Sequence, residues 1–214
     1  MTGTRGRLVA LEGIDGCGKS TQARMLAERL GVASTLEPVA TFEPGATPLG
    51  ASLRSLLLGR DGAPVAPRAE ALLMAADRAQ HVADVIAPAL AAGRWVVTDR
   101  YSASTLAYQG FGRGLDLAEL EELVGWATGG LRPDLTVLFD LPVEVAAARR
   151  RGDGDDRMEA EGLAFQQRVA DGFQSLAAGG TEPWLVVDAT EPVEMIAAAV
   201  WDAVEVLAGP GGLP

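Results

Sequence analysis

The chain has 214 residues, 48% of them hydrophobic, which is enough to bury the core of one full-sized domain. Its formal net charge of -11 argues against a general nucleic-acid-binding protein, which needs a basic surface to neutralise phosphates. The apolar runs are too short and too often interrupted for a membrane span, and a single cysteine excludes a disulfide framework within the chain. Any anionic ligand must therefore be held by a local basic cluster.

The organisation of the chain is simple. No repeat or linker divides residues 1–208, which are expected to form one domain, and residues 209–214 are expected to be a disordered tail. The N-terminus carries no signal-peptide pattern, which together with the single cysteine predicts a cytoplasmic protein.

The first predicted elements are a strand and a helix. Residues 8–11 form a short, continuously apolar run, as expected for a strand that is buried on both faces of a parallel sheet. Residues 22–30 carry Ala23, Leu26 and Leu30 at helical spacing, and Gly31 is expected to end this helix.

A phosphate-binding loop (P-loop) connects these two elements. The residues from Gly13 to Ser20 match G-x-x-x-x-G-K-[ST], and the only lysine of the chain, Lys19, occupies the lysine position. A lone lysine would match this pattern by chance on the order of once in a thousand. In such a loop the backbone N–H groups hold a polyphosphate, the lysine reaches its β and γ phosphates, and the Ser20 hydroxyl faces Mg²⁺. The residues expected to bind ATP are Gly13, Ile14, Asp15, Gly16, Cys17, Gly18, Lys19, Ser20 and Thr21.

Strands and helices alternate along the rest of the chain. Short apolar runs predict inner strands at 95–98, 135–141 and 184–187, and a weaker strand at 36–41. Apolar periodicity and Gly or Pro stops predict helices at 49–58, 68–90, 117–127, 143–151, 162–177 and 193–207. This alternation predicts an α/β fold in which a parallel sheet is covered by helices on both faces and ligands bind at the carboxyl ends of the strands.

A polar cluster follows the strand predicted at 95–98. Asp99 and Arg100 come first, and a polar stretch continues to Gln109. At this end of the sheet the cluster lies beside the P-loop, so Asp99 can accept a Mg²⁺-bound water and Arg100 can clamp a phosphoryl group. A local salt bridge between the two is the alternative, but the polar stretch is long for that role.

An arginine cluster ends the helix predicted at 143–151. Three consecutive arginines begin at Arg149, and Arg157 follows in a polar, acidic stretch. Because successive helical residues are rotated by about 100°, the three cannot share one face. We favour Arg149 and Arg151, together with Arg157, as ligands of the same phosphates. The alternative is that the arginines only complement the negative end of the helix dipole.

Four separated segments together resemble the bacterial thymidylate kinases, over about residues 8–190. They are residues 13–21, 42–58, 99–114 and 156–159. The resemblance implies a P-loop NTPase-type fold with an Arg-rich lid at about 149–159, a homodimer, and transfer of the γ-phosphoryl group of ATP to dTMP with Mg²⁺. The implied catalytic residues are Lys19, Asp99, Arg100, Arg149, Arg151 and Arg157, and the implied metal ligands are Ser20 and Asp99.

The same resemblance assigns a substrate site residue by residue. It implies that Asp15 holds the 3'-hydroxyl of the acceptor sugar, that Arg54 and Arg100 hold the acceptor phosphate, and that Glu43 lies near the metal. The remaining substrate residues surround the nucleoside: Arg78 and Gln109 at the thymine edge, Thr105 beside the base, Tyr108 under the deoxyribose and Met74 on the thymine face. Met74 stands where the family has a phenylalanine, and Phe42 and Ala46 replace an arginine and a glycine.

Several of these residues could instead have a purely structural role. Arg78 is close in sequence to Asp77 and could form a solvated ion pair, Arg54 could only extend along an apolar helix, and His81 is expected to be structural. Two other functions also share the P-loop. They are a kinase for another nucleotide or deoxynucleoside and a nucleotide-dependent regulatory ATPase, of which the latter leaves Arg54, Arg100 and Gln109 unexplained.

Overall fold

The computed structural model describes residues 5–59, 64–150, 161–179 and 182–209. Five parallel strands form one sheet in the order β2-β3-β1-β4-β5. Their bounds are β1 Leu8–Glu12, β2 Val39–Phe42, β3 Val96–Asp99, β4 Leu135–Asp140 and β5 Trp184–Asp188. The sheet is therefore parallel, as the sequence predicts.

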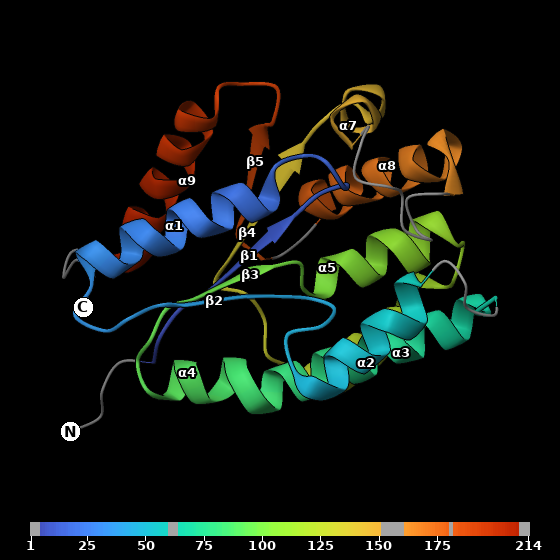
Figure 1. Ribbon diagram of the computed structural model, residues 1–214, viewed down its shortest axis with the longest axis horizontal. Coiled ribbons are helices and arrows are strands. Elements are labelled where there is room, and N and C mark those ends of the chain that lie inside the picture. The colour runs from blue at the N-terminus through green and yellow to red at the C-terminus, as the bar shows by residue number, and fades with distance from the viewer. Residues whose placement is uncertain (1–4, 60–63, 151–160, 180–181, 210–214) are drawn as a thin grey trace.

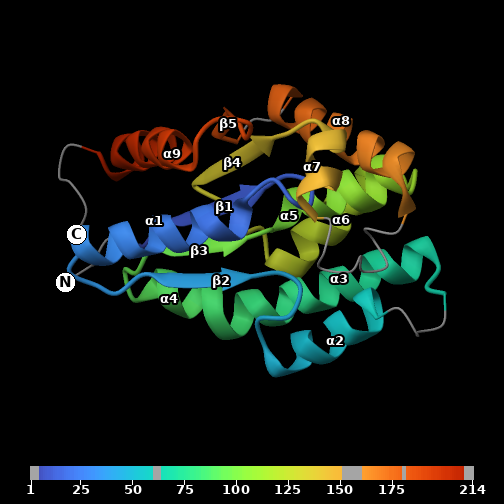
Figure 2. The same ribbon diagram turned by 45° about the horizontal axis from the view of Figure 1, so that its top comes forward.

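Helices cover both faces of this sheet (Figure 1). The described helices are α1 Lys19–Ala33, α2 Pro48–Leu58, α3 Pro67–His81, the π-helix η1 Val82–Ile86, α4 Ala87–Ala91, α5 Ser102–Thr105, the π-helix η2 Leu106–Gly112, α6 Leu117–Thr128, α7 Val143–Arg150, α8 Leu163–Gly179 and α9 Val193–Ala208. Helices α1 and α9 lie on one face, and the continuous rod of α3, η1 and α4 lies on the other, as Figures 1 and 2 show.

The core sits between these layers because the strands are apolar on both sides. Val9 and Leu11 of β1 pack in the larger core cluster with residues of α1 and α9, whereas Leu8 and Ala10 pack with Ile86 and its neighbours. All five residues of β1 are buried. The strand that leads into the P-loop is thus held in the centre of the protein.

Most predicted elements are confirmed within one to three residues, and one expectation is wrong. Gly31 does not end the first helix, which continues to Ala33. Ser34 has an extended backbone and caps the helix by donating its N–H to the carbonyl oxygen of Leu30. A single glycine weakens a helix by about 1 kcal/mol without ending it. Residues 102–112, for which the sequence gives no secondary-structure prediction, form α5 and η2.

Two other expectations lie wholly or largely outside the described residues. Helix α7 is described to Arg150, so most of the proposed lid, including Arg151 and Arg157, lies in the gap at 151–160. The expected tail is described only at Gly209. Among the helices that the structure describes, none combines the length and the apolar character needed to cross a membrane.

The sheet register brings the strand ends together. Leu11 of β1 and Phe42 of β2 both pair with Asp99 of β3. The P-loop after β1, Glu43 after β2 and Arg100 after β3 therefore emerge side by side at the carboxyl edge of the sheet.

Candidate active site

The P-loop joins β1 to the N-terminus of α1. Gly18 caps this helix with a φ of 96°, in the left-handed region that glycine adopts without strain. Gly13 lies so close to β4 that an added Cβ would stand 2.7 Å from the carbonyl oxygen of Phe139. These two glycines let the loop curl tightly before the helix, so its N–H groups and the helix dipole face the same side.

Lys19 is folded back over the loop. Its side chain is buried, and Nζ donates to the carbonyl oxygens of Gly13 at 3.1 Å and Ile14 at 3.0 Å. Nζ also lies 4.0 Å from a carboxylate oxygen of Asp15. The ammonium group thus stands at the mouth of the P-loop, where a polyphosphate could replace the two carbonyl groups as its partner.

Ser20 and Asp99 form a pair of oxygen ligands next to the lysine. The Ser20 hydroxyl donates to Oδ2 of Asp99 over 2.5 Å. No group of three or more His, Cys, Asp or Glu side chains among the described residues could hold a metal ion by itself. One hydroxyl and one carboxylate nevertheless fit Mg²⁺, which prefers hard oxygen ligands and takes most of them from water and phosphates.

Arg100 has a strained backbone at the end of β3. Its φ of 73° is the positive φ of a non-glycine residue, a conformation that costs on the order of 1–3 kcal/mol. The surrounding structure holds it there, because its N–H donates to Leu11 and its carbonyl accepts from the Thr98 hydroxyl, each at 2.9 Å. From this backbone position the guanidinium group extends across the P-loop and donates to the carbonyl oxygen of Gly13 and to Asp15.

Asp15 is the acidic partner of this guanidinium. Arg100 binds its Oδ1, and the Tyr108 hydroxyl donates to its Oδ2 at 2.9 Å. Burial alone would raise the pKa of the Asp15 carboxyl, but the charges of Arg100 and Lys19 outweigh it and hold this pKa well below its usual range. Asp15 is therefore a carboxylate at every physiological pH.

Two hollows meet at these residues. We call the first the Tyr108 cavity; it is lined by Asp15, Glu43, Pro44, Arg54, Leu58, Met74, Asp77, Arg78, Arg100, Ser104, Thr105, Tyr108 and Gln109. We call the second the P-loop groove; it runs from Gly16, Gly18, Lys19 and Ser20 along α1 and includes Asp99 and Arg149. Both are bounded by the same four charged residues, Asp15, Glu43, Arg54 and Arg100.

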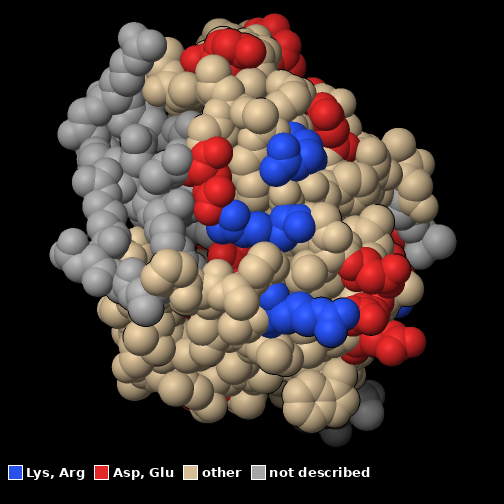
Figure 3. Space-filling model, turned by 90° about the vertical axis from the view of Figure 1, so that its right-hand side faces the viewer, with Lys and Arg blue, Asp and Glu red and all other residues tan. Residues whose placement is uncertain are grey.

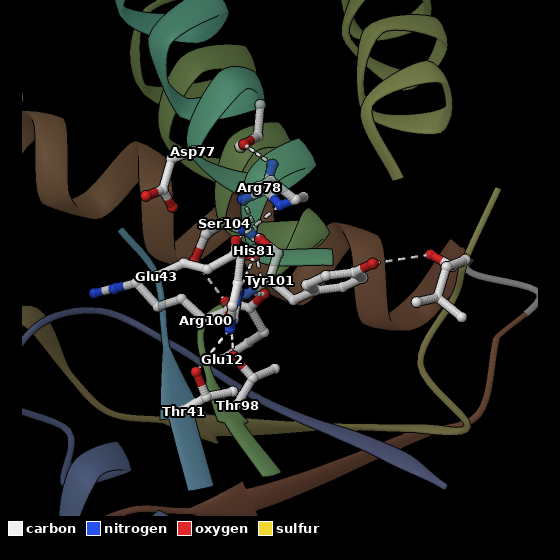
Figure 4. A network of polar contacts seen from close by, with 12 residues as sticks. Glu12, Thr41, Glu43, Asp77, Arg78, His81, Thr98, Arg100, Tyr101 and Ser104 are labelled. Atoms are coloured by element: carbon white, nitrogen blue, oxygen red, sulfur yellow. Dashed lines mark hydrogen bonds and ion pairs between the residues drawn. The ribbon is translucent and has the colours of Figure 1, made fainter. Parts of the chain in front are cut away.

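A buried polar network supports the floor of the Tyr108 cavity (Figure 4). Arg78 donates from Nε to Glu43 at 2.8 Å, from one terminal nitrogen to Thr105 at 2.7 Å and from the other to the carbonyl oxygen of Tyr101 at 2.8 Å. Only 2% of Arg78 is exposed, so the alternative of a solvated ion pair is wrong. His81 binds the other oxygen of Glu43 at 2.9 Å, which agrees with a structural role.

Glu12 supports the Asp99 to Ser104 segment from below. It is fully buried at the end of β1 and accepts hydrogen bonds from the N–H groups of Tyr101 and Ser104 and from the Ser104 hydroxyl. Burial raises the pKa of this carboxyl, although the bond from Ser104 and the charge of Arg100 oppose the shift. Glu12 thus fixes the turn that carries Arg100.

The structure brings together every described residue that sequence analysis assigns to the site. Arg54 is exposed at the junction of the two hollows and donates to the carbonyl oxygen of Pro44 at 2.8 Å. Met74 lines the Tyr108 cavity, and Arg149 reaches the P-loop groove while donating to the carbonyl oxygen of Ala189. Asp99 and Arg100 form no salt bridge with each other, so the local alternative is wrong. Arg151 and Arg157 lie outside the described residues.

Three buried acidic residues stand behind the site and have no role among the sequence-based predictions. They are Glu12, Glu70 and Asp77, which is 1% exposed and accepts from the N–H of Gly45. One signal for Glu12 was present, because a carboxylate ends an otherwise apolar buried strand. Glu70 and Asp77 lie in a predicted helix, and their positions in the sequence pattern of that helix do not distinguish them from charged residues exposed to solvent.

Positive charge is local on the face of the molecule shown in Figure 3. On the face shown in Figure 3, Lys or Arg side chains gather near the middle, and acidic side chains lie directly beside them. This pattern suits one anionic ligand held by a few residues better than a long polyanion.

Comparison with known proteins gives a consistent result. Residues 11–200 match the family model described as Thymidylate kinase. The chain is 53% identical to the thymidylate kinase of Synechococcus sp. strain CC9902 over 196 residues, 89% of this chain and 93% of the relative. It is 56% identical to that of Synechococcus sp. strain WH7803 over 179 residues, 81% of this chain and 84% of the relative. The crystal structure of thymidylate kinase from Ehrlichia chaffeensis superposes with a TM-score of 0.76 at 29% identity, over 94% of this chain and 99% of that chain.

Proposed function

Because the chain belongs to the thymidylate kinase family, we propose that it phosphorylates dTMP to dTDP with ATP as the phosphoryl donor. The observation that carries this proposal is the common boundary of the P-loop groove and the Tyr108 cavity. Two substrates bound in these hollows would meet end to end, as in-line phosphoryl transfer requires. The acceptor is already a phosphate oxyanion, so no general base is needed.

The donor triphosphate is assigned to the P-loop. The N–H groups at the start of α1 bind its oxygens, and Lys19 leaves the carbonyl groups of Gly13 and Ile14 for the β and γ phosphates. An ammonium group at this position neutralises charge that builds on the transferring group.

Ser20 and Asp99 are assigned to Mg²⁺, the proposed cofactor. The hydroxyl and the carboxylate are adjacent and of the ligand type that Mg²⁺ prefers. A bound Mg²⁺ would neutralise and orient the donor phosphates. Asp99 positions the Ser20 hydroxyl by accepting its hydrogen bond, so the two residues act as one unit.

The nucleotide acceptor is assigned to the Tyr108 cavity. Arg54 and Arg100 are placed at its phosphate, and Asp15 and Tyr108 at its sugar, where the bulk of the tyrosine opposes a 2'-hydroxyl. The base is assigned to the part of the cavity lined by Met74, Arg78, Thr105 and Gln109. Glu43 is assigned to the junction with the donor, because it lines both hollows.

The catalytic arginines are assigned to a lid at about residues 149–159 of a single kinase domain spanning 1–208. Arg149 supports this assignment, because it is exposed at the end of α7 and lines the P-loop groove. Arg151 and Arg157 are proposed to join it at the transferring phosphoryl group. Closure of such a lid would exclude water and so prevent hydrolysis of ATP.

A homodimer and a cytoplasmic location complete the proposal. Helices α3 and α6 carry two exposed apolar side chains, Leu72 at 59% and Trp126 at 83% exposure, which support a contact with a second copy. The single buried Cys17 suits a reducing compartment.

The test is an assay of ADP release with Mg-ATP and a panel of nucleoside monophosphates, with a control that lacks any acceptor. We expect strong preference for dTMP. Equal use of several monophosphates would show that the Tyr108 cavity does not select thymine. ADP release without an acceptor would favour a regulatory ATPase instead.

A further inference from the structure

A buried carboxylate, Glu70, stands directly behind the base region of the Tyr108 cavity. It lies in the first turn of α3 and is 0% exposed. Its Oε1 accepts a 2.9 Å hydrogen bond from Nε2 of Gln109, and Arg113 donates to Oε1 at 3.2 Å and to Oε2 at 3.1 Å. Gln109 lies in η2 and Arg113 caps its end, so both reach the same carboxylate.

This arrangement fixes which end of the Gln109 amide faces Glu70. Both oxygens of Glu70 accept hydrogen bonds from the guanidinium group of Arg113, and a carboxylate only accepts hydrogen bonds. The NH₂ group of Gln109 must therefore face Glu70. The orientation of the amide follows from the chemistry of its partner and is not a free choice between two similar ends.

The oxygen of the same amide is left for the cavity. Gln109 lines the Tyr108 cavity, and within the described part of the chain no group donates to its Oε1. Among the described residues, the side-chain atoms that are fully buried and lack a hydrogen-bond partner do not include Oε1 of Gln109. Gln109 is 1% exposed as a whole, so this acceptor lies in the wall of the cavity, where only a molecule bound inside the cavity would meet it.

Arg78 adds donors to the same wall. It carries five N–H groups, of which three are donated to described residues, Glu43, Thr105 and Tyr101. The wall thus offers guanidinium donors beside an amide acceptor. Thymine and uracil present a carbonyl acceptor at C4 beside an N–H donor at N3, which matches this wall. Cytosine presents an amino donor and a ring acceptor at these positions and is mismatched at both.

We propose that Glu70 is a positioning residue for base selection, which with Arg113 turns the Gln109 amide so that only its oxygen faces the base and thereby favours 4-oxo pyrimidines over cytosine. This inference rests on the proposed function, because it needs a nucleotide base in the Tyr108 cavity. Without the charge of Glu70, Gln109 can turn its amide over and donate to the ring nitrogen of cytosine.

The isosteric variant Glu70→Gln tests this role. Initial rates of ADP formation are measured with dTMP, dUMP and dCMP at saturating Mg-ATP. We expect the ratio of kcat/KM for dTMP over dCMP to fall about tenfold, since the variant removes one of the two hydrogen-bond mismatches of cytosine. The ratio for dTMP over dUMP should stay the same, because both bases share the 4-oxo edge. An unchanged dTMP over dCMP ratio would overturn the proposal, because a purely structural role weakens all acceptors alike. An equal fall in both ratios would also overturn it, because the loss would then not depend on the 4-oxo edge that dTMP and dUMP share.

Two further variants complete the test. Arg68→Gln changes an exposed residue of the same helix, paired with Glu119, and should leave both ratios as they are. The double variant Glu70→Gln/Gln109→Glu places an acceptor-only carboxylate toward the base and a carboxamide behind it. Its preference for dTMP over dCMP should return toward that of the wild type, also where Glu70→Gln alone does not fold, and a preference that stays lost would overturn the proposal.

Equilibrium binding separates this inference from the proposed function. If the wild-type protein transfers no phosphoryl group to any acceptor, the proposed function fails. Dissociation constants of dTMP and dCMP without ATP still report the amide orientation in that case. We expect their ratio to change in Glu70→Gln in the same direction as the kinetic ratio, and an unchanged binding ratio would count against Glu70.

Discussion

The hydroxyl of Tyr108 donates a 2.9 Å hydrogen bond to Asp15 and so ties the wall of the Tyr108 cavity to the P-loop. Its ring packs against Phe165 and Phe173, which keeps the hydroxyl in place. Tyr108→Phe should retain this packing but loosen Asp15, so we expect kcat/KM for dTMP to fall about tenfold. Steady-state kinetics and the unfolding temperature measure the two effects separately.

Tyr101→Phe is the matched control for this prediction. The Tyr101 hydroxyl donates to the carbonyl oxygen of Leu131 at 3.2 Å and does not line either hollow. Its removal should lower the unfolding temperature but leave kcat/KM unchanged. If both variants lose activity equally, the bond to Asp15 has no special part in catalysis.

Lys19→Ala should abolish turnover without unfolding the protein. The variant loses the charge at the mouth of the P-loop, and we expect kcat to fall about a thousandfold or more. Circular dichroism and thermal unfolding should remain near those of the wild type. Arg132→Gln, which removes an exposed charge paired with Glu182, serves as the control with normal kcat. Substantial activity in Lys19→Ala would refute the role assigned to the lysine.

Asp99→Asn should change the requirement for Mg²⁺. The asparagine oxygen can still accept from Ser20, but the negative charge that would favour the cation is lost. We expect the half-saturating Mg²⁺ concentration to rise about tenfold or more. Asp188 also ends a strand, β5, and is held by Thr190, so Asp188→Asn is the control. A Mg²⁺ titration that is identical for both variants would remove Asp99 from the metal site.

Asp15 should contribute stability that depends on pH. Its pKa in the folded protein lies below the value of about 3.9 in the unfolded chain. The contribution is therefore complete above about pH 4 and is lost as the pH falls through the folded pKa. The free energies of unfolding of the wild type and of Asp15→Asn should differ by a constant amount at neutral pH and converge in acid. A difference that grows on acidification would contradict this assignment.

His81→Phe should destabilise the fold. Nε2 of His81 lies 2.7 Å from the Thr41 hydroxyl, Nδ1 lies 2.9 Å from Glu43, and the ring is fully buried. The phenylalanine ring has no nitrogen, so the Thr41 hydroxyl and one oxygen of Glu43 lose their hydrogen bonds to the ring. We expect the free energy of unfolding in urea to fall by about 2 kcal/mol. Gln80→Ala, on the exposed side of the same helix, should change stability little. Equal stability of the two variants would show that the network around Glu43 reorganises without loss.

The sequence predicts the fold well because the three inner strands of the sheet are buried on both faces. Strands such as β1 and β4 are short apolar runs between Gly- or Pro-containing turns, and a parallel arrangement follows from the intervening helices. The P-loop is equally predictable, since its spacing is local. Helices α5 and η2 could not be predicted, because small and polar side chains there face buried partners rather than forming an apolar stripe.

The supporting residues of the site depend on contacts between distant segments. Arg78 and Glu43 are 35 positions apart, and Glu70 and Gln109 are 39 apart, so no local pattern reveals either pair. The positive φ of Arg100 is also invisible in the sequence, because arginine rarely adopts it and only the surrounding bonds enforce it.

The common boundary of the two hollows also matters for inhibitors. Asp15, Glu43, Arg54 and Arg100 each face both the P-loop groove and the Tyr108 cavity. A small molecule that spans the boundary would therefore contact side chains that border both proposed substrate sites. On the proposed function, a resistance mutation at any of the four would alter the walls of both substrate sites, which leaves the protein few substitutions that exclude such a compound and keep activity.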